Sequence, residues 1–254
     1  MSCIDFVGKT VVVTGSARGI GKRIAERFYE NGANVIFCGR TDIRKQGIID
    51  HLAYFDDARF MFCEVDVAKL NEIDALFDAS ISRFGGVDIL VNNAGVWEQG
   101  SIFDADESQW NRVIDTDLKS VFFASQRFCE HRKDVGEPGA IVNVSSINAV
   151  RCRPDCAVYN VAKAGVKSVT ETFAMEAGAY GIRVNAVGPG SVPTDLNAAL
   201  YKNPAVEKAY SATVPLGRRG TTDEVSNVVL FLASDDASYL TGQSIYVEGG
   251  WLLR

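Results

Sequence analysis

Short apolar segments alternate with longer amphipathic ones along the chain. Each apolar segment is rich in Val, Ile or Phe, which predicts a strand buried on both faces. Seven such strands are expected, at residues 10–13, 34–38, 60–65, 87–91, 140–144, 183–187 and 244–247. The segments between them have helical periodicity, beginning with residues 21–31. This alternation predicts an α/β fold, in which helices cover both faces of a doubly wound parallel sheet.

The alternation runs through the chain without a linker, a repeat or a low-complexity tract. We therefore expect residues 1–254 to form a single domain. Only residues 189–215 break the rhythm, because prolines and glycines punctuate a segment of mixed helical character. A connection of this length is typical of a lid or a substrate-binding loop. The alternative is an irregular connection with no such role.

Composition narrows the classes of function. The chain has 254 residues, of which 47% are hydrophobic and 23% charged, enough for a sizeable core. Its net charge of −6 argues against a nucleic-acid binder, whose footprint is a basic face. No apolar run reaches membrane-spanning length, and the first residues lack the basic and apolar regions of a signal peptide. We expect a cytoplasmic protein with no nucleic-acid or membrane partner.

The six cysteines are scattered, and several lie in strand-like segments, which favours reduced thiols over a disulfide framework. Cys152 and Cys156 are the only near pair, and their spacing is not that of a CxxC motif. The chain has two histidines, and neither lies beside a nucleophile signature. We therefore expect neither a metal site nor histidine-based catalysis.

Three residues can surround one reacting carbonyl. Tyr159 and Lys163 are four apart, so on a helix they share a face. A nearby ammonium favours phenolate and lowers a tyrosine pKa from its usual value of about 10. Ser146 follows the strand at 140–144, at the strand end where active-site groups of open α/β sheets gather. The set suits acid/base chemistry on an alcohol or carbonyl, although such a Tyr and Lys are more commonly a packed ring and a solvated charge.

A glycine-rich turn directly follows the first strand. Residues 14–21 read TGSARGIG and open into a helix. Glycines let the backbone approach a pyrophosphate, and the helix N-terminus offers unpaired N–H groups to that anion. Gly39 and Arg40 directly follow the second strand, where an NAD site would carry a carboxylate. Arg40, with Arg18, suits a 2′-phosphate instead, so NADP(H) is favoured and NAD(H) is the alternative, unless both arginines are merely surface charges.

Together these residues resemble the motifs of the short-chain dehydrogenase/reductase family, over almost the whole chain. The resemblance rests on several motifs in a fixed order: Thr14 to Gly21, Asp66-Val67, Asn92-Asn93-Ala94-Gly95, Ser146 with Tyr159-x-x-x-Lys163, and Pro189-Gly190 with Thr194. It implies a Rossmann-like sheet of about seven strands. It also implies an oxidoreductase that transfers a hydride between a nicotinamide cofactor and a small-molecule substrate.

The resemblance assigns roles to individual residues. Tyr159 is implied as the acid/base, and Ser146 as the group that holds the substrate oxygen. Lys163 is implied as a ribose ligand that also lowers the Tyr159 pKa. Including the residues already argued above, the cofactor-binding set is Gly15, Ser16, Arg18, Gly19, Ile20, Arg40, Asp66, Val67, Asn93, Tyr159, Lys163, Val192 and Thr194.

One position departs from the family pattern. Many members carry an asparagine seven residues after a tryptophan, and its backbone helps hold a water that relays protons to the lysine. Here Trp110 is followed at that spacing by Asp117. If only the backbone at this position helps to hold the water, replacing asparagine by aspartate is tolerated. A carboxylate near Lys163 would strengthen its hold on the ammonium and shift both pKa values.

The expected surroundings of the substrate are polar: Ser146, Asn148, Tyr159, Ser191 and Asn197. Buried amides and hydroxyls need hydrogen-bond partners, which favours a hydroxylated substrate such as a sugar or polyol. Two alternatives stay open. One is reduction of a 3-oxoacyl thioester, and the other is a nucleotide-binding scaffold that has kept the fold and lost the chemistry.

The family is commonly tetrameric, and we expect a homotetramer. Residues 240–253 end apolar, which is unusual for a free tail. The tail is expected to pack either between subunits or onto its own subunit.

Overall fold

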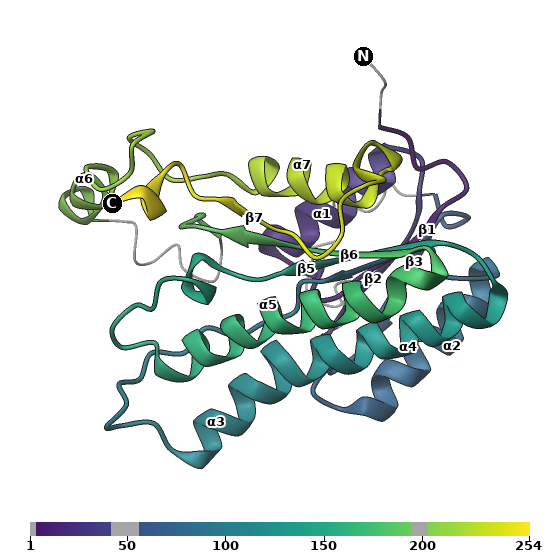
Figure 1. Cartoon of the computed structure of the whole chain (residues 1–254), viewed down its shortest axis with the longest axis horizontal. Coiled ribbons are helices and arrows are strands. Elements are labelled where there is room, and N and C mark those ends of the chain that lie inside the picture. The colour runs from purple at the N-terminus through teal and green to yellow at the C-terminus, as the bar shows by residue number, and fades with distance from the viewer. Residues whose placement is uncertain (1–3, 42–55, 195–202) are drawn as a thin grey trace.

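The computed structural model describes residues 4–41, 56–194 and 203–254. Within them lies a seven-stranded, all-parallel sheet in the order β3-β2-β1-β4-β5-β6-β7 (Figure 1). The strands are β1 (Thr10–Val13), β2 (Asn34–Gly39), β3 (Phe60–Glu64), β4 (Ile89–Asn92), β5 (Gly139–Val144), β6 (Ile182–Pro189) and β7 (Ser244–Val247). The strand order reverses between β1 and β4, and open α/β sheets bind ligands outside the carboxyl ends of the strands at such a point.

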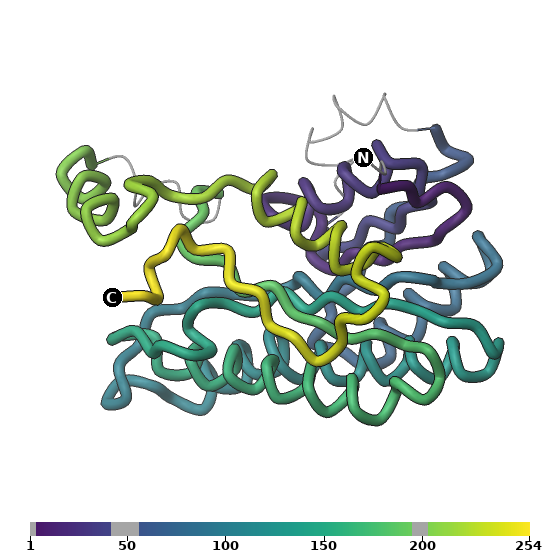
Figure 2. Tube along the Cα trace, turned by 45° about the horizontal axis from the view of Figure 1, so that its top comes forward, coloured from purple at the N-terminus to yellow at the C-terminus, as the bar shows by residue number. Residues whose placement is uncertain are grey.

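Helices cover both faces of this sheet (Figures 1 and 2). α1 and α7 pack together on one face, whereas α2, α4 and α5 lie on the other. The helices are α1 (Gly19–Glu30), α2 (Leu70–Phe84), α3 (Glu107–Ile114), α4 (Ser120–Val135), α5 (Ala157–Ala177), α6 (Pro204–Ser211) and α7 (Thr222–Ala233). A single π turn, Asp115–Lys119, joins α3 to α4. The predicted doubly wound parallel architecture is confirmed.

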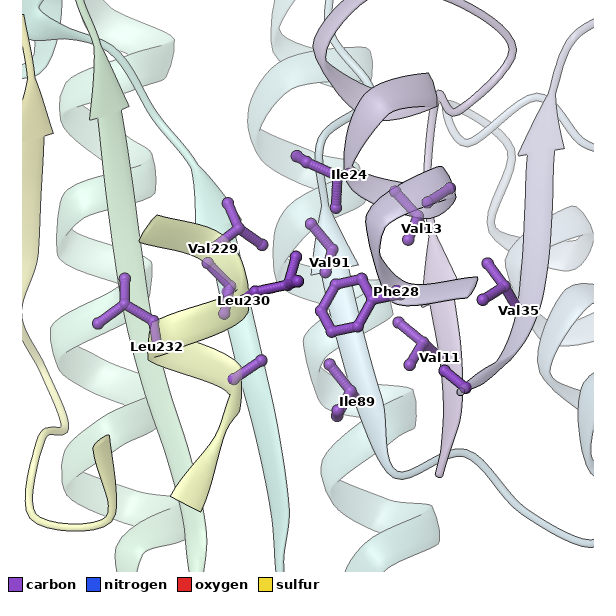
Figure 3. Packing of buried hydrophobic residues seen from close by; sticks show 14 of the residues in the cluster. Val11, Val13, Ile24, Phe28, Val35, Ile89, Val91, Val229, Leu230 and Leu232 are labelled. Carbon is purple, nitrogen blue, oxygen red and sulfur yellow. The ribbon is translucent and has the colours of Figure 1, made fainter. Parts of the chain in front are cut away.

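The two faces of β1 contribute to different parts of the core. Val11 and Val13 point toward α1, where they join Ile24 and Phe28 in one apolar cluster (Figure 3). Val12 lies between them in sequence and joins the cluster on the opposite face. Side chains alternate across a strand, so a strand covered on both sides must be apolar at every position. This requirement explains the uninterrupted apolar segments of the sequence.

The strands lie where the apolar pattern predicts them, with ends shifted by at most two residues. α1 begins at Gly19 rather than at residue 21, because the end of the glycine-rich turn is already helical. The segment predicted as an excursion, 189–215, contains the last residue of β6 and all of α6. Residues 195–202 lie outside the described part of the chain, and the role of the segment as a lid stays a prediction.

A network of buried amide and hydroxyl groups connects β4 and β5, at the centre of the sheet, to α4 and α5. The Nδ2 atom of Asn92, in β4, donates to Ser125 Oγ in α4 at 3.0 Å and to Asn143 Oδ1 in β5 at 2.9 Å. The Nδ2 atom of Asn143 in turn donates to Thr170 Oγ1 in α5 at 2.9 Å. All four residues are buried. Each of these four side chains therefore has a hydrogen-bond partner, as the loss of water requires.

The five cysteines among the described residues form no disulfide: Cys38, Cys63, Cys129, Cys152 and Cys156. Burial raises the pKa of the Cys38 thiol to about 12 and that of Cys63 to about 11. Both thiols are therefore protonated at neutral pH and poorly reactive. In the described ranges, no helix is both long and apolar enough to span a bilayer.

The last residues of the sequence contact their own subunit. The Arg151 guanidinium lies 4.8 Å from the centre of the Trp251 ring, and Arg254 donates a hydrogen bond to the carbonyl of Ala212 at 2.7 Å. Packing of the tail between subunits stays a prediction. The homotetramer stays a prediction.

We expect Asn143→Ala to lower the free energy of unfolding by about 1–3 kcal/mol, because it leaves buried groups of Asn92 and Thr170 with fewer partners. Urea denaturation followed by circular dichroism measures this change. The matched control is Glu171→Ala, which removes half of an exposed ion pair with Lys167 on α5 and should change stability by less than about 0.5 kcal/mol. Equal losses in the two variants would contradict a role for the buried network.

Candidate active site

Ser146, Tyr159 and Lys163 come together at the carboxyl edge of the sheet. Ser146 follows the end of β5 and caps the short 3₁₀ turn Ile147–Ala149, where its Oγ accepts a hydrogen bond from the Asn148 N–H at 3.1 Å. Tyr159 and Lys163 lie on successive turns of α5, with the lysine Nζ 5.5 Å from the centre of the tyrosine ring. The Ser146 side chain is close enough to the Tyr159 phenol to act on its pKa.

Two hydrogen bonds fix the start of α5 against the end of β5. The Lys163 Nζ donates to the carbonyl of Val144 at 3.3 Å. The Ser145 hydroxyl donates to the carbonyl of Lys163 at 3.1 Å. Lys163 and Ser146 are both buried, so their relative position depends on packing rather than on flexible surface contacts.

Opposing influences act on the acidity of Tyr159. Burial raises the pKa of Tyr159 above its ordinary value. The Lys163 ammonium and the Ser146 side chain lower the pKa, whereas the Asp117 carboxylate raises it further. The net direction is upward, so the predicted lowering by Lys163 is present but is outweighed by burial. The phenol is therefore the stable form at neutral pH.

Asp117, the residue that departs from the family pattern, reaches this group of side chains. It lies in the π turn between α3 and α4, and its carboxylate Oδ2 is 3.0 Å from the Lys163 Nζ. Burial has the largest effect on the pKa of each group: it raises the pKa of Asp117 and lowers that of Lys163. The Asp117 carboxylate nevertheless helps to raise the pKa of Lys163 above its ordinary value. The salt bridge between Asp117 and Lys163 therefore lies next to the Tyr159 ring.

Asn148 is buried, and its side chain is held by the protein. Its Nδ2 donates to Asn160 Oδ1 at 2.8 Å, and the Asn160 Nδ2 donates to the carbonyl of Arg153 at 2.9 Å. Asn160 thereby connects the turn after Ser146 with the loop that leads into α5. Asn160 is not part of any motif in the sequence. Its position next to Tyr159 was the only available indication.

The glycine-rich turn packs so closely on the loop after β4 that larger residues do not fit. A Cβ atom on Gly15, whose φ is +64°, would lie 2.7 Å from the Cα of Ala94. A Cβ on Gly21 would lie 2.2 Å from the Asn93 Nδ2, which donates to the carbonyls of Thr14 and Gly15. The turn therefore leads tightly into α1, whose first turn has no acidic residue. Such a helix N-terminus fits a pyrophosphate.

The remaining cofactor candidates differ in exposure. Ser16 is buried, and its hydroxyl donates to the carbonyl of Val13 at 2.7 Å and accepts from the Cys38 N–H at 2.9 Å. Its side chain therefore joins β1 to β2. Arg18 and Arg40 are both exposed at the edge of this turn. A cationic rim of this kind fits a phosphate on the adenosine ribose.

Asp66 and Val67 follow β3 and differ in their contacts. The carboxylate of Asp66 accepts a hydrogen bond from the Ala68 N–H at 3.2 Å, which forms a tight turn. Val67 is buried in the cluster under α2. The two residues thus border the same end of the sheet as the glycine-rich turn.

The loop after β6 approaches the start of α1. A Cβ on Gly19 would lie 3.4 Å from the Thr194 side chain, and both residues line a pocket of about 250 Å³. Val192 is buried nearby, and Ser191 accepts a hydrogen bond from Arg219. Ile20 lies in the first turn of α1. Asn197 lies outside the described residues.

Comparisons with known proteins agree with this geometry. A family model described as enoyl-(acyl carrier protein) reductase matches residues 15–252. The chain is 41% identical over 252 residues to 3beta-hydroxysteroid dehydrogenase 1 of Eggerthella lenta, covering 98% of this chain and 95% of that protein. It is 38% identical over 247 residues to a 3-oxoacyl-(acyl-carrier-protein) reductase of Vibrio cholerae, covering 97% and 98% of the two chains.

A solved structure extends the comparison. The gluconate 5-dehydrogenase of Burkholderia cenocepacia, in complex with NADP and tartrate, matches with a TM-score of 0.91 at 29% identity, over 99% of this chain and 98% of that chain. The chain therefore belongs to the short-chain dehydrogenase/reductase family. It has the Rossmann-like fold of that family and is an oxidoreductase that acts on hydroxyl-bearing substrates.

We expect Asn160→Ala to lower turnover by roughly ten- to a hundredfold while leaving cofactor affinity unchanged, because small displacements of positioned groups are costly in rate. Steady-state kinetics and fluorescence titration with reduced cofactor measure the two quantities. Asn31→Ala is the control. In the described part of the chain, the Asn31 side chain makes one hydrogen bond, to the Arg27 carbonyl at the end of its own helix. Loss of turnover and cofactor binding together would show that Asn160 supports the fold rather than the site.

Proposed function

We propose that this chain is an NADP(H)-preferring oxidoreductase that interconverts a secondary alcohol or hemiacetal with the corresponding carbonyl compound. Its substrate is a polar hydroxylated molecule such as a sugar or polyol. The observation that carries the proposal is the convergence of the Ser146 hydroxyl, the Tyr159 phenol and the Lys163 ammonium at the end of β5. The bound nicotinamide supplies the hydride acceptor or donor.

Each side chain has a distinct part in this proposal. The Ser146 hydroxyl holds the substrate oxygen, with its orientation supported by the Asn148 N–H. Tyr159 takes the hydroxyl proton during oxidation and returns it during reduction. Lys163 binds the cofactor ribose and stabilises the phenolate that forms on Tyr159. The side chains mainly orient the substrate and move one proton, which is where positioning contributes most.

The preference for NADP(H) rests on the end of β2. Gly39 has no side chain, and a Cβ there would lie 3.2 Å from the Cβ of Ala17, so a carboxylate is both absent and hard to accommodate. Arg40 follows directly and is exposed, as is Arg18 across the turn. The match to a structure that contains NADP supports the same preference.

The substrate class has weaker support from the described side chains than from the comparison. Asn148 and Ser191 already bond Asn160 and Arg219, so their polar groups do not by themselves require a polar ligand. The matching gluconate 5-dehydrogenase is complexed with tartrate, a small hydroxy acid. We therefore keep a sugar, polyol or sugar acid as the proposed class. Residues 189–215 are the proposed substrate lid.

Reduction of a 3-oxoacyl thioester is the second candidate. It is favoured by the 38% identity to a reductase of that name over nearly the whole chain. Both functions would use the same three catalytic side chains. They would differ in the side chains that contact the rest of the substrate.

The test is the change in reduced-nicotinamide absorbance with purified protein, NADP⁺ and NAD⁺ being supplied separately. The panel contains aldoses, polyols, gluconate and a 3β-hydroxysteroid, and a 3-oxoacyl thioester is tested with NADPH. Rapid NADP⁺ reduction with a sugar or polyol supports the proposal. Thioester-dependent NADPH oxidation alone supports the second candidate. Turnover with the steroid alone overturns the proposed substrate class.

We expect Arg40→Ala to weaken NADP⁺ binding by roughly ten- to a hundredfold, because one charge-assisted contact to the 2′-phosphate is lost. Binding of NAD⁺ should stay unchanged, since it lacks that phosphate. Isothermal titration with each cofactor measures both affinities. The control is Arg83→Ala, which removes an exposed arginine in the last turn of α2. Equal weakening of NADP⁺ and NAD⁺ in the Arg40 variant would contradict the assignment.

The raised pKa of Tyr159 predicts opposite pH profiles for the two directions. Oxidation needs the phenolate, so kcat/KM for the alcohol should rise with pH through the neutral and into the alkaline range. Reduction needs the phenol, so its rate should be level at neutral pH and fall in alkaline solution. Steady-state rates in both directions across pH measure this. An oxidation rate that is level from mildly acidic to alkaline pH would contradict the raised pKa.

A further inference from the structure

Asp117 is a carboxylate without solvent exposure, held at a break in a long helix. Its fractional exposure is 0%, and it lies in the π turn Asp115–Lys119 between α3 and α4. A π turn inserts one extra residue into a helix and is often found at functional sites. Burying a carboxylate is unfavourable unless it is paired and hydrogen-bonded. The contacts of this residue therefore need an explanation in terms of function or folding.

Each oxygen of Asp117 has a different neighbour. Oδ1 accepts a hydrogen bond from the Val96 N–H at 2.7 Å, which anchors the loop after β4. Oδ2 lies 3.0 Å from the Lys163 Nζ. Gly95 makes this approach feasible, because a Cβ there would lie 2.8 Å from Oδ2 and 3.5 Å from Nζ. The carboxylate thus connects the cofactor loop to the lysine behind Tyr159.

The charges around the lysine leave Asp117 as its main counter-ion. From α5 itself, the Tyr159 phenol faces the ammonium. From the loop after β4, Glu98 acts on Asp117, but its own carboxylate lies 3.0 Å from the guanidinium of Arg112. The Glu98 charge is therefore largely compensated.

The loop before α5 contributes one further titratable group, the buried Cys156 thiol near Tyr159. Of the groups that act on the pKa of Tyr159, Cys156 has the smallest effect. The Asp117 carboxylate therefore offsets part of the positive charge that Lys163 presents to the phenol. A lysine without that carboxylate would present a full positive charge.

We propose that Asp117 is a positioning residue that fixes Lys163 and offsets part of its charge, so that Tyr159 gives up its proton only in more alkaline solution than it would beside an amide at position 117. The consequence is an enzyme adjusted toward carbonyl reduction at neutral pH, because the protonated phenol is the form that reduction uses. This inference rests on the proposed acid/base function of Tyr159.

The test is an ultraviolet absorbance titration of Tyr159 in the protein without cofactor or substrate. The Tyr159 signal is the difference between each protein and the same protein carrying Tyr159→Phe. In Asp117→Asn, which keeps the size of the side chain, Tyr159 should ionise at a pH lower by roughly one unit, because a like charge near the phenolate is removed. Asp117→Ser, which is uncharged and smaller, should shift the titration in the same direction.

The matched control is Asp115→Asn, which removes a carboxylate from the same π turn. Asp115 pairs with Lys119 at 2.9 Å on the surface, so this variant should leave the Tyr159 titration unchanged. Circular dichroism verifies the fold of every variant. The proposal is overturned if Tyr159 ionises at the wild-type pH or above it in both Asp117 variants, if it ionises in none of the proteins before unfolding, or if Asp115→Asn gives the same shift.

A second readout separates this inference from the proposed function. With a substrate from the panel, the pH at which oxidation begins to rise should move down by a similar amount in Asp117→Asn. A shift in the titration without turnover on any substrate would sustain the role of Asp117 while the proposed function fails. Turnover with unshifted titration and unshifted pH profile would sustain the function while the role of Asp117 fails.

Discussion

The buried Lys163 ammonium is the group on which the arrangement of the site depends. A charge removed from water must be paired and hydrogen-bonded. Lys163 is only 4% exposed, and its partners come from separate elements: the Val144 carbonyl at the end of β5, Asp117 in the π turn, and Tyr159 one turn earlier in α5. Satisfying the lysine therefore holds α5 against the sheet and against the helix that contains the π turn. The same contacts place the phenol beside Ser146.

The cofactor end of the molecule depends on a second constraint, the close approach of two backbones. Gly15 and Gly21 permit the glycine-rich turn to pack against the loop after β4, and Asn93 bonds the turn through its side chain. That loop continues to Val96, whose N–H binds Asp117. A continuous series of contacts therefore runs from the expected pyrophosphate site to the lysine behind Tyr159. The first site lies at the carboxyl end of β1 and the second at the carboxyl end of β5, with β4 between them.

The fold was largely predictable from the sequence, whereas the support of the site was not. A strand such as residues 10–13 is apolar throughout because both of its faces are covered, and this pattern is visible without a structure. The spacing of Tyr159 and Lys163 likewise fixes a shared helix face. The bonds of Asn160 and Ser191 were not predictable, because their partners are distant in sequence and are selected by tertiary packing. For Asp117, spacing from a tryptophan indicated the position, but only the fold revealed its complete burial.

The central claim is that Ser146 and Tyr159 act together on one substrate oxygen. The most direct measurement is the single-turnover rate of hydride transfer in Ser146→Ala, Tyr159→Phe and the double variant, followed by reduced-nicotinamide absorbance. Residues that act as a unit lose most of the rate when either one is removed, and removing both adds little. We therefore expect the double variant to be about as slow as Tyr159→Phe alone. Losses that multiply, or a Tyr159→Phe rate near that of the wild type, would contradict the account.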